Sequence, residues 1–588
     1  MKILGIHDGH LGTAALLIDG RIAAMASEER FTRRKNQGGA PARAVAWALE
    51  HAGVRGSELD AVALATLSQP LTDWESSGAQ FRRRAFQAAS LLLPGAILGS
   101  SALVRPYVRL YRRRRDWASL DAALVQNGIP PGSYAGHRYE HHQCHAATAY
   151  YLFPGRRDDE PVLVVTADAS GDGLCATVAI GRAGRIERLH SIPSYHSIGE
   201  LYTRVTELLG MKPLDHEYKV MGLAPYAPPA LAERAYRVFS RYYRPVAGGL
   251  GFENRSGTWG PRMAARLARD LAGMRFDAVA AGVQRLTEEI VTGFVLAWVR
   301  KTGVRRVAVA GGLFMNVKLN MLLAESPEIE GFFPMPSCGD ESVALGAALL
   351  AHAACRGARA AAQELRPLEH LYLGPEFTDG QILAALGQCR DRIAWEEPED
   401  IEAETARRLA RGEIVGRFSG RMEWGARALG NRSILADPRD LRNIRRLNAA
   451  IKKRDFWMPF APSILEERSS DYLHNPRGRA APFMILAFRT TALAERDLAC
   501  GLHQYDLTCR PQIVARSANP EFHRLISEFQ KLTGVGAVIN TSFNLHGEPI
   551  VCSPADALRT FLESEMDALA MGKYLVRKKN APDQPATR

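Results

Sequence analysis

The segment EHHQCHAATAYY, residues 140–151, carries two histidines whose spacing suits metal binding. His141 and His145 are four residues apart, so on a helix they share one face and can bind one ion. Asp168, in the Gly-rich stretch DASGDG, and Asp340, ahead of a Gly/Ala-rich segment, add two carboxylates. This donor set suits a divalent transition ion such as Fe(II), Mn or Zn, and the spacing does not choose among them. The alternative for the bare histidine pair is a His-rich helix start that holds no metal.

Two further side chains near the start of the chain have the chemistry needed for proton transfer. His7 and Asp8 stand at the turn after the first apolar run, where a histidine can act as acid or base. The alternative is a polar pair that caps the turn. Cys144 lies between the two metal-site histidines and is interpreted as a packed thiol, although its spacing from His141 also allows it to point at the site.

The elements that must position these residues form a repeat. An apolar strand, a Gly-rich turn with an acidic residue and a hairpin occur twice, in KILGIHDGHLGTAALLIDGRIAAMA from residue 2 and in VLVVTADASGDGLCATVAIGRAGRIERL from residue 162. A further strand, VRRVAVA at 304–310, ends in Gly311 and Gly312 and leads into a predicted helix over 314–325. This order outlines the duplicated fold of the actin, sugar-kinase and Hsp70 ATPases, in which Gly turns let phosphate approach backbone N–H groups.

Length and composition indicate a globular α/β protein of two large domains. The chain has 588 residues, 46% hydrophobic and 23% charged, which excludes collagen, coiled coil and wholesale disorder. An Ala/Arg-rich stretch at 352–366 is predicted to be a helix or linker, so we expect domains over 1–360 and 361–588. The opening residues lack the apolar core of a secretory signal, and the eight cysteines form no CxxC pair. Reduced thiols and a cytoplasmic location are therefore expected.

The formal charge of +12 is concentrated in part around an apolar stretch at about 78–120, which has arginines at 82–84 and 112–115. Pro94, Gly95 and two serines interrupt the apolar run, so a membrane-spanning helix is not expected. The segment is predicted to be a helical insertion that either packs on its own domain or contacts a membrane surface or a partner.

Nine groups of residues, in order along nearly the whole chain, stand out as motifs: HDGHLGTAALLIDG with EERFTRRK, EHHQCHAA, DASGDG, HEYKVMGLAPY, GGLFMN, CGDESVALGAA, GRMEWGARALGNRSILADPR, IKKRDFWMPFAPSIL and NTSFNLHGEPIV. These blocks resemble the NodU/CmcH family of O-carbamoyltransferases. Each block alone is a weak signal, and their joint order makes the resemblance specific. It implies a Kae1-like domain of the duplicated actin-like ATPase class, followed by a YrdC-like α/β domain.

The resemblance also implies an enzyme with two sites. The YrdC-like site is expected to make carbamoyl adenylate from carbamoyl phosphate and Mg-ATP, releasing phosphate and pyrophosphate. At the Kae1-like site a hydroxyl of a small-molecule acceptor, of the natural-product or sugar type known from antibiotic biosynthesis, attacks the carbamoyl carbon and AMP leaves. The family's metal ligands, with Fe(II) as the expected ion, fall on His141, His145, Asp168 and Asp340. Its catalytic histidine falls on His7, with His10 as the alternative.

In the second domain the resemblance aligns Arg427, Lys452 and Ser542 with the family's phosphate-binding residues. Forked guanidinium donors suit these highly anionic substrates. Further candidates for binding carbamoyl phosphate and ATP are Arg421, Arg432, Lys453, Arg454, Arg510 and Asn544. Met458 stands where the family commonly has Arg, so either Lys453 or Arg454 supplies the missing charge or the triphosphate is held differently.

In the transfer site, Glu217 and Lys219 are predicted to face the adenylate, with Gly311, Gly312 and Asn316 around its ribose and base. The alternative is that Glu217 and Lys219 only pair across a strand edge. A rival function keeps the fold but carbamoylates an amine or thiol on RNA or a protein partner, including a threonylcarbamoyl-type modification. Nucleic acid is not expected, because no basic motif interleaved with aromatic residues is present.

Two other functions are weaker matches. A scaffold or nucleotide-sensing regulator on an actin-like fold predicts that the paired histidines are dispensable. A sugar kinase leaves the second domain without a role. The acceptor cannot be identified from the chain, and a homodimer is compatible with the family.

Overall fold

The computed structural model describes residues 1–67, 118–157, 159–448, 455 and 457–579. Within them the chain forms two compact units. The first comprises Met1–Glu29 and Asn36–Glu369, and the second comprises Arg30–Lys35 and His370–Arg588. The Ala/Arg-rich stretch predicted as a helix or linker forms the end of α14 (Val343–Arg356) and α15 (Ala358–Glu364), both in the first unit.

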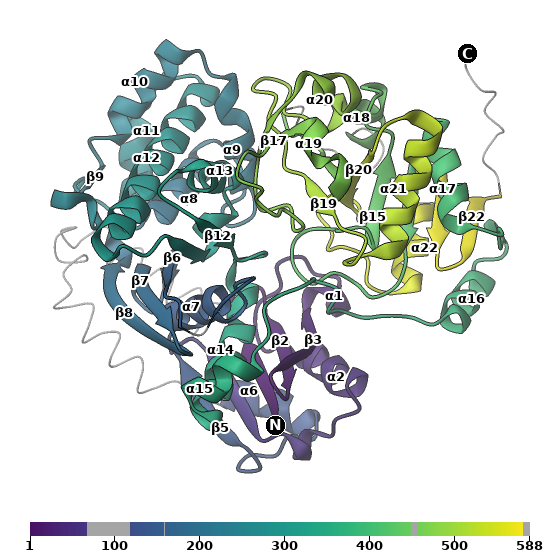
Figure 1. Cartoon of the computed structure of the whole chain (residues 1–588), viewed down its shortest axis with the longest axis horizontal. Helices are drawn as coiled ribbons and strands as arrows, with labels where there is room; N and C mark the ends of the chain where they lie inside the picture. Colours follow the sequence, from purple (N-terminus) through teal and green to yellow (C-terminus); the bar gives the residue numbers. More distant parts are fainter. Residues whose placement is uncertain (68–117, 158, 449–454, 456, 580–588) are drawn as a thin grey trace. The chain divides into compact units, whose positions relative to one another are not determined.

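The first unit contains two five-stranded sheets with the same topology (Figure 1). In each sheet the first three strands along the chain form an antiparallel set, and the fourth strand pairs in parallel with the first. The fifth strand then pairs in parallel with the fourth. The first sheet has the order β3-β2-β1-β4-β5, with β1 Lys2–His7, β2 Thr13–Ile18, β3 Arg21–Ser27, β4 Ala61–Ala65 and β5 Ala135–Tyr139. The second has the order β12-β11-β6-β7-β8, with β6 Val162–Gly171, β7 Leu174–Arg182, β8 Arg185–Pro193, β11 Arg306–Ala310 and β12 Gly331–Pro334. This repeat confirms the predicted duplicated actin-like fold.

Two helices pack in the middle of the duplication. α7 (His141–Tyr151) packs on β6 and β11, α14 packs on β1, β2 and β4, and the two helices pack on each other. Glycines allow the close approaches, because a Cβ at Gly346 would lie 2.1 Å from the Cys144 carbonyl oxygen and one at Gly5 would lie 2.0 Å from the Ala344 carbonyl oxygen. β1 and β4 are apolar and almost wholly buried, as expected of strands covered on both faces.

A group of helices continues from the second sheet and surrounds α12 (Phe276–Thr302), which ends at Gly303 with a left-handed φ of 71°. Its members are α8 Ile198–Leu208, α9 Glu217–Leu223, α10 Pro229–Phe239, α11 Pro261–Asp270 and α13 Val317–Glu325, with the short strands β9 Tyr243–Pro245 and β10 Phe252–Asn254 alongside. α2 (Ala42–His51) packs on β2 and β3, and α6 spans Ala118–Gln126. Of the predicted insertion at about 78–120, residues 78–117 lie outside the described part of the chain.

The second unit is an α/β domain built on one mixed eight-stranded sheet, in the order β13-β22-β21-β14-β15-β20-β16-β19. Its strands are β13 Ile393–Glu396, β14 Val415–Phe418, β15 Arg432–Ala436, β16 Ala461–Leu465, β19 Gln512–Val514, β20 Ala537–Ser542, β21 Ala568–Met571 and β22 Tyr574–Lys578. The main helices are α16 Asp379–Gln388, α17 Ile401–Ala410, α21 Pro520–Thr533 and α22 Pro554–Leu562, with shorter α18 Arg442–Leu447, α19 Ser469–Tyr472 and α20 Ala492–Asp497 and the strand pair β17 Leu473–His474 and β18 Arg489–Thr490.

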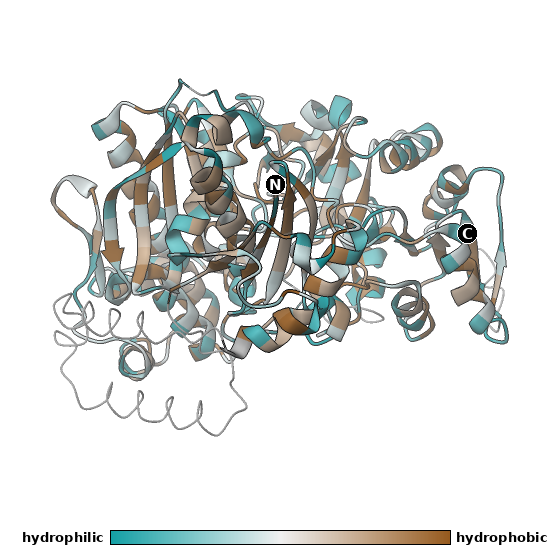
Figure 2. Cartoon of the chain, turned by 90° about the horizontal axis from the view of Figure 1, so that it is seen from below, coloured by the Kyte–Doolittle hydropathy of each residue, from teal (hydrophilic) through white to brown (hydrophobic). Residues whose placement is uncertain are grey.

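Figure 2 shows the apolar residues concentrated on the strands, while the helices carry hydrophilic faces. In the second unit, Phe418, Phe543 and Phe561 belong to one buried core, whose residues range in sequence from Ile382 to Val576. Burying such aromatic side chains contributes about 1.5–3 kcal/mol each to folding. Among the described residues, no helix has the length and apolar character needed to cross a membrane.

Candidate metal centre and phosphate-binding loops

The helix α7 begins at His141 because Glu140 caps it. The Glu140 carboxylate accepts hydrogen bonds from the backbone N–H groups of His142 and Gln143, and the Gln143 side chain completes the capping box. Arg188 forms an ion pair with the same carboxylate. This cap fixes the first turn, so the four-residue spacing places His141 and His145 on one face, as predicted.

Four predicted ligands converge at this face of α7. The donor atoms of His141, His145, Asp168 and Asp340 all lie within 4.8 Å of one another. The Asp168 carboxylate is 3.4 Å from His141 Nε2 and 3.2 Å from His145 Nε2, and the Asp340 carboxylate is 3.6 Å from His141 Nε2. The two Nε2 atoms are 3.0 Å apart. Three separate segments therefore contribute to one cluster: α7, strand β6 and the short turn that precedes α14.

The protonation equilibria of the cluster show how strongly its groups interact. Burial lowers the pKa of His141, but Asp168 and Asp340 outweigh it and raise the value to about 9. Burial lowers the pKa of His145, and the neighbouring His141 lowers it further. Burial also raises the pKa of Asp340 to about 7, with Asp168 acting in the same direction. Buried carboxylates and imidazoles at this separation share protons, and a divalent cation can take the place of those protons. The donor set fits such an ion.

Groups around the cluster hold its ligands in place. The Ser342 hydroxyl lies 3.4 Å from His145 Nδ1 and donates to the Gly339 carbonyl at 2.9 Å. Gly171 supports the His141 ring, because a Cβ there would lie 2.1 Å from its Cδ2 atom. Gly312, predicted to contact the adenylate, lies beside the same cluster: a Cβ there would be 3.1 Å from Asp168 Oδ1.

His7 lies next to this cluster. Its Nε2 atom is 3.9 Å from the Asp340 carboxylate and 3.0 Å from the His10 carbonyl oxygen, to which it must donate. Gly9 accommodates the imidazole, because a Cβ there would lie 2.4 Å from two ring atoms. Asp8 is 6% exposed in the same turn. Burial lowers the pKa of His10, and the negative charge of Asp168 partly offsets that effect. His10 therefore interacts electrostatically with a residue of the cluster.

The third histidine of α7 has a structural role. His142 is fully buried, with Nδ1 2.8 Å from the Thr166 hydroxyl and Nε2 3.1 Å from the Leu174 carbonyl oxygen. The Thr166 hydroxyl also forms a hydrogen bond with the Thr177 hydroxyl, with 2.7 Å between the two oxygens. Both ring nitrogens are thus used within the sheet. Cys144 is fully buried, and burial raises the pKa of its thiol, as expected of a packed thiol.

Asp172, which the sequence did not single out, holds the start of α7. Its carboxylate accepts from the backbone N–H of His141 at 2.9 Å and from that of Leu67 at 3.0 and 2.9 Å. It therefore satisfies an N–H group at the start of α7 that has no partner within the helix. The second acidic residue of the DASGDG block was the available signal, since a carboxylate at a helix N-terminus is favourable.

The residues predicted to bind adenylate lie on separate elements of the first unit. Glu217 and Lys219 lie on α9, so the alternative of a pair across a strand edge is wrong, and their i, i+2 spacing directs them apart. Glu217 accepts from Thr203 at 3.1 Å and from the Leu214 N–H at 2.8 Å, and burial raises its pKa. Gly311 has a φ of 100° and meets the Ala167 carbonyl oxygen, where a Cβ would lie at 2.2 Å.

Asn316 has two structural partners. Its side chain caps α13 by accepting from the Leu319 N–H at 3.1 Å. The same amide exchanges hydrogen bonds of 2.9 and 3.1 Å with Gln284 on α12. These contacts set the start of α13 after the Gly311–Gly312 turn.

In the second unit, the loop of residues 419–431 between β14 and β15 carries two of the predicted phosphate-binding arginines. The Glu423 carboxylate, 2% exposed, accepts from the backbone N–H groups of Leu429, Asn431 and Arg432 at 2.7, 2.7 and 3.2 Å. Arg421 donates to the Leu373 and Gly374 carbonyls at 3.0 and 3.1 Å. The loop is thus held by one buried carboxylate inside it and by backbone carbonyls beside it.

Arg432, counted among the phosphate-binding cations, is instead a core residue. It is fully buried, and its guanidinium donates to the carbonyls of Ser419, Asn431, Pro375 and Gly420 at 2.8–3.2 Å. The guanidinium carbon, Cζ, also lies 3.7 Å from the centre of the Phe418 ring. Burial lowers the pKa of Arg432 to about 10. Its Nη1 and Nη2 groups donate to the backbone, so this pair of donors is not free to hold a phosphate.

The remaining predicted phosphate ligands are distributed over several loops. Ser542 ends β20 and donates to Asn544 Oδ1 at 2.6 Å, and the Asn544 amide donates to the Leu545 and Glu548 carbonyls. Arg510 donates to the Met484 carbonyl at 3.2 Å. Arg427 lies in the 419–431 loop. Lys452, Lys453 and Arg454 lie outside the described residues, so the expected compensation for Met458 stays a prediction.

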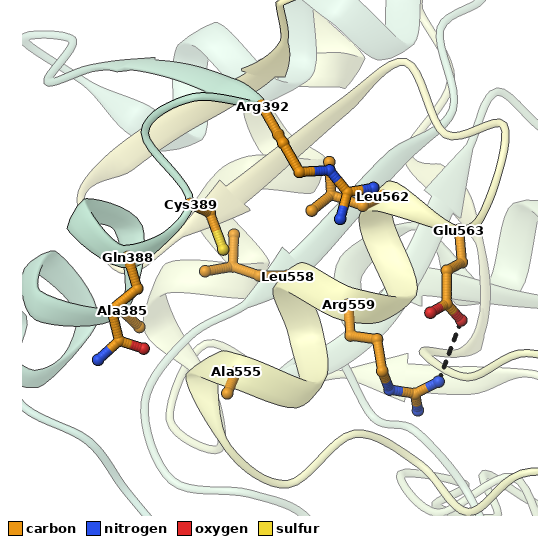
Figure 3. A pocket seen from close by; sticks show the side chains of 9 residues that line it. All are labelled: Ala385, Gln388, Cys389, Arg392, Ala555, Leu558, Arg559, Leu562 and Glu563. Carbon is orange, nitrogen blue, oxygen red and sulfur yellow. Dashed lines mark hydrogen bonds and ion pairs between the residues drawn. The ribbon is translucent and has the colours of Figure 1, made fainter.

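A separate cavity of about 160 Å³ lies between α16 and α22 (Figure 3). Apolar side chains such as Leu558 and Leu562 form its floor, and Arg392, Arg559 and Glu563 surround it. None of the predicted site residues within the described part of the chain lines it. This cavity is therefore not the site that the sequence predicts.

Comparisons with known proteins cover both units. The family profile described as Carbamoyltransferase N-terminus matches residues 2–349, and that described as Carbamoyltransferase C-terminus matches residues 406–578. The chain is 32% identical to nodulation protein NolNO of Sinorhizobium fredii, over 98% of this chain and 80% of that protein. It is 36% identical to nodulation protein NolO of Bradyrhizobium diazoefficiens, over 75% of this chain and 79% of that protein. An uncharacterized protein of Methanocaldococcus jannaschii is 30% identical over 98% of this chain and 99% of its own length.

Proposed function

The chain belongs to the carbamoyltransferase family, and from that premise we propose that it is an ATP-dependent O-carbamoyltransferase with two half-reactions. The donor is carbamoyl phosphate, the activated intermediate is carbamoyl adenylate, and the acceptor is a hydroxyl group of a small molecule of natural-product or sugar type. The cluster of two histidines and two carboxylates beside His7 is the single observation that carries the proposal, because these residues could hold a metal ion next to a group able to accept a proton.

The first half-reaction belongs to the second unit. Water attacks carbamoyl phosphate and releases phosphate, and the resulting carbamate oxygen attacks the α-phosphorus of ATP. The bond to pyrophosphate breaks and carbamoyl adenylate remains. Arg427, Arg510 and Lys452 supply positive charge for these anions, and the Ser542–Asn544 pair supplies neutral hydrogen-bond donors and acceptors. Arg421 holds the loop through the Leu373 and Gly374 carbonyls.

The second half-reaction belongs to the first unit. The acceptor oxygen attacks the carbamoyl carbon, its proton leaves to His7, and the bond to the AMP oxygen breaks. His141, His145, Asp168 and Asp340 would hold a divalent ion, Fe(II) in preference to Mn or Zn, and its positive charge would polarise a carbonyl or phosphate oxygen. His7 donates from Nε2 to the His10 carbonyl, a bond that orients its ring next to Asp340. The Gly311–Gly312 turn and α9 are the proposed contacts of the adenylate.

Measuring phosphate and pyrophosphate release tests the proposal directly. Purified protein given ATP and carbamoyl phosphate without an acceptor is expected to release both products, and release of each should require both substrates. Lys452→Ala is expected to abolish this release, since a lysine that faces phosphate contributes a charge no neutral side chain replaces. Transfer from separately generated carbamoyl adenylate should remain.

The matched control is Lys531→Ala, because Lys531 is an exposed lysine of the same unit whose ion pair, with Glu528, lies within α21. Equal loss of both half-reactions in Lys452→Ala would contradict the division into two sites. A panel of hydroxylated metabolites, an amine-bearing RNA and a thiol-bearing peptide then identifies the acceptor class. Modification of the RNA or peptide alone would replace the hydroxyl acceptor in the proposal.

A further inference from the structure

A short segment from the N-terminal part of the chain belongs to the second unit. Residues Arg30–Lys35, here called the strap, leave the first unit after Glu29 and return to it at Asn36. The Glu29 carboxylate accepts from the Asn36 backbone N–H at 2.7 Å, which closes the strap at its base. The strap therefore has a defined start and end, and Arg30, Phe31 and Arg33 each contact residues of the second unit.

The strap contacts the loop that carries the proposed phosphate-binding arginines. The Arg30 guanidinium, on a residue that is 7% exposed, donates to the Gly425 carbonyl at 2.8 Å. Gly425 has a φ of 103° and stands two positions before Arg427. Phe31 packs against a small buried cluster that includes Met422 of the same loop. A buried guanidinium is costly unless its donors are used, so Arg30 is held here by the loop backbone.

The strap also contacts the segment that follows Ser542 and Asn544. Arg33 donates to the carbonyls of Ile550 and Pro549 at 2.7 and 2.8 Å, and its Nε lies 3.4 Å from the Asp556 carboxylate. Arg33 adopts a φ of 62°, a left-handed conformation that persists only where surrounding contacts impose it. Ile550 and Cys552 belong to the cluster that Phe31 covers.

We propose that the strap is a positioning element for the ATP and carbamoyl phosphate site of the second unit, with Arg30 as the positioning residue for the Arg427 loop. This inference rests on the proposed function. The strap joins the two segments that supply Arg427 on one side and Ser542 and Asn544 on the other, and it sets their backbones through charged hydrogen bonds. Adenylate formation thus depends on residues encoded beside the first hairpin of the first unit.

The experiment compares Arg30→Ala, Arg30→Lys and Arg34→Ala in the full-length protein. Arg34 is an exposed residue of the same strap and serves as the control. The first measurement, amide hydrogen exchange, needs no activity. Arg30→Ala is expected to speed exchange in peptides covering 422–432 by about tenfold or more, because a hydrogen bond to a charged group is lost. Arg34→Ala and peptides of the first-unit sheets should keep wild-type rates, and an unchanged 422–432 in Arg30→Ala would overturn the inference.

The second measurement is pyrophosphate release. In Arg30→Ala, kcat/KM for carbamoyl phosphate is expected to fall about ten- to hundredfold, with partial recovery in Arg30→Lys, which keeps the charge and N–H donors on a single nitrogen. An equal loss in Arg34→Ala, or no recovery in Arg30→Lys together with unchanged exchange, would overturn the positioning role. If the wild-type protein releases no pyrophosphate, the proposed function fails, and the exchange rates of 422–432 alone decide the role of the strap.

Discussion

Replacing Gly171 with alanine is expected to perturb the proposed metal centre without replacing any of its ligands. The added Cβ would lie 2.1 Å from Cδ2, 2.3 Å from Cγ and 2.8 Å from Cβ of His141. Carbon atoms in contact are separated by about 3.5–4.0 Å. The His141 ring or the end of β6 must therefore shift by about 1.4–1.9 Å, the difference between that contact distance and the 2.1 Å in the structure. A ring displaced by this much no longer directs Nε2 at the point shared with His145 and Asp168.

The expected consequence is weaker metal binding in a folded protein. Loss of the groups that orient a metal ligand reduces affinity by about 10- to 100-fold, which is about 1.4–2.8 kcal/mol. The overpacking itself costs about 1–3 kcal/mol of stability. The assay is a calorimetric titration of the chelator-treated protein with Fe(II) under anaerobic conditions. Parallel titrations use Mn and Zn.

Gly293→Ala is the matched control. Gly293 lies within α12, and a Cβ there would meet no atom within 4 Å. Alanine in a helix interior is favoured over glycine by about 0.5–1 kcal/mol, so this variant should be slightly more stable and bind metal as the wild type does. Wild-type metal affinity in Gly171→Ala, with a wild-type unfolding temperature for the metal-free protein, would refute the argument that this glycine positions His141.

Two other predictions address which buried polar groups are functional. His145→Gln should contain no metal in elemental analysis of the purified protein, whereas His142→Gln should retain it. His142→Gln should unfold at a lower denaturant concentration, because losing the hydrogen bonds to the sheet costs about 1–3 kcal/mol. Metal loss in both variants would contradict the separate roles of the two histidines. In the second unit, Arg417 and Glu402 form a buried pair at 2.9 Å, with side chains 1% and 6% exposed. Arg417→Met should destabilise that unit by about 3–5 kcal/mol, and adding Glu402→Leu should restore much of the loss. A double variant no more stable than the single one in denaturant unfolding would show that the pair is not the cause.

The sequence by itself determined the local parts of this protein. The alternation of apolar runs and Gly-rich turns predicted both hairpins of the duplication, because strand and turn propensities act over a few residues. The four-residue spacing placed His141 and His145 on one face, since helix geometry alone sets that relation. The ordered blocks identified the family, which the family profiles confirm over both units.

Only the tertiary structure decided which distant groups meet and which polar groups remain available. Asp168 and Asp340 approach the histidines because β6 and the start of α14 both pack against α7. A guanidinium can donate to phosphate oxygens or to backbone carbonyls, and an arginine in the sequence does not show which acceptors surround it. Arg432 is enclosed by four carbonyls, and Arg30 reaches Gly425 across a long stretch of sequence. Their roles follow from long-range packing, which no local pattern specifies.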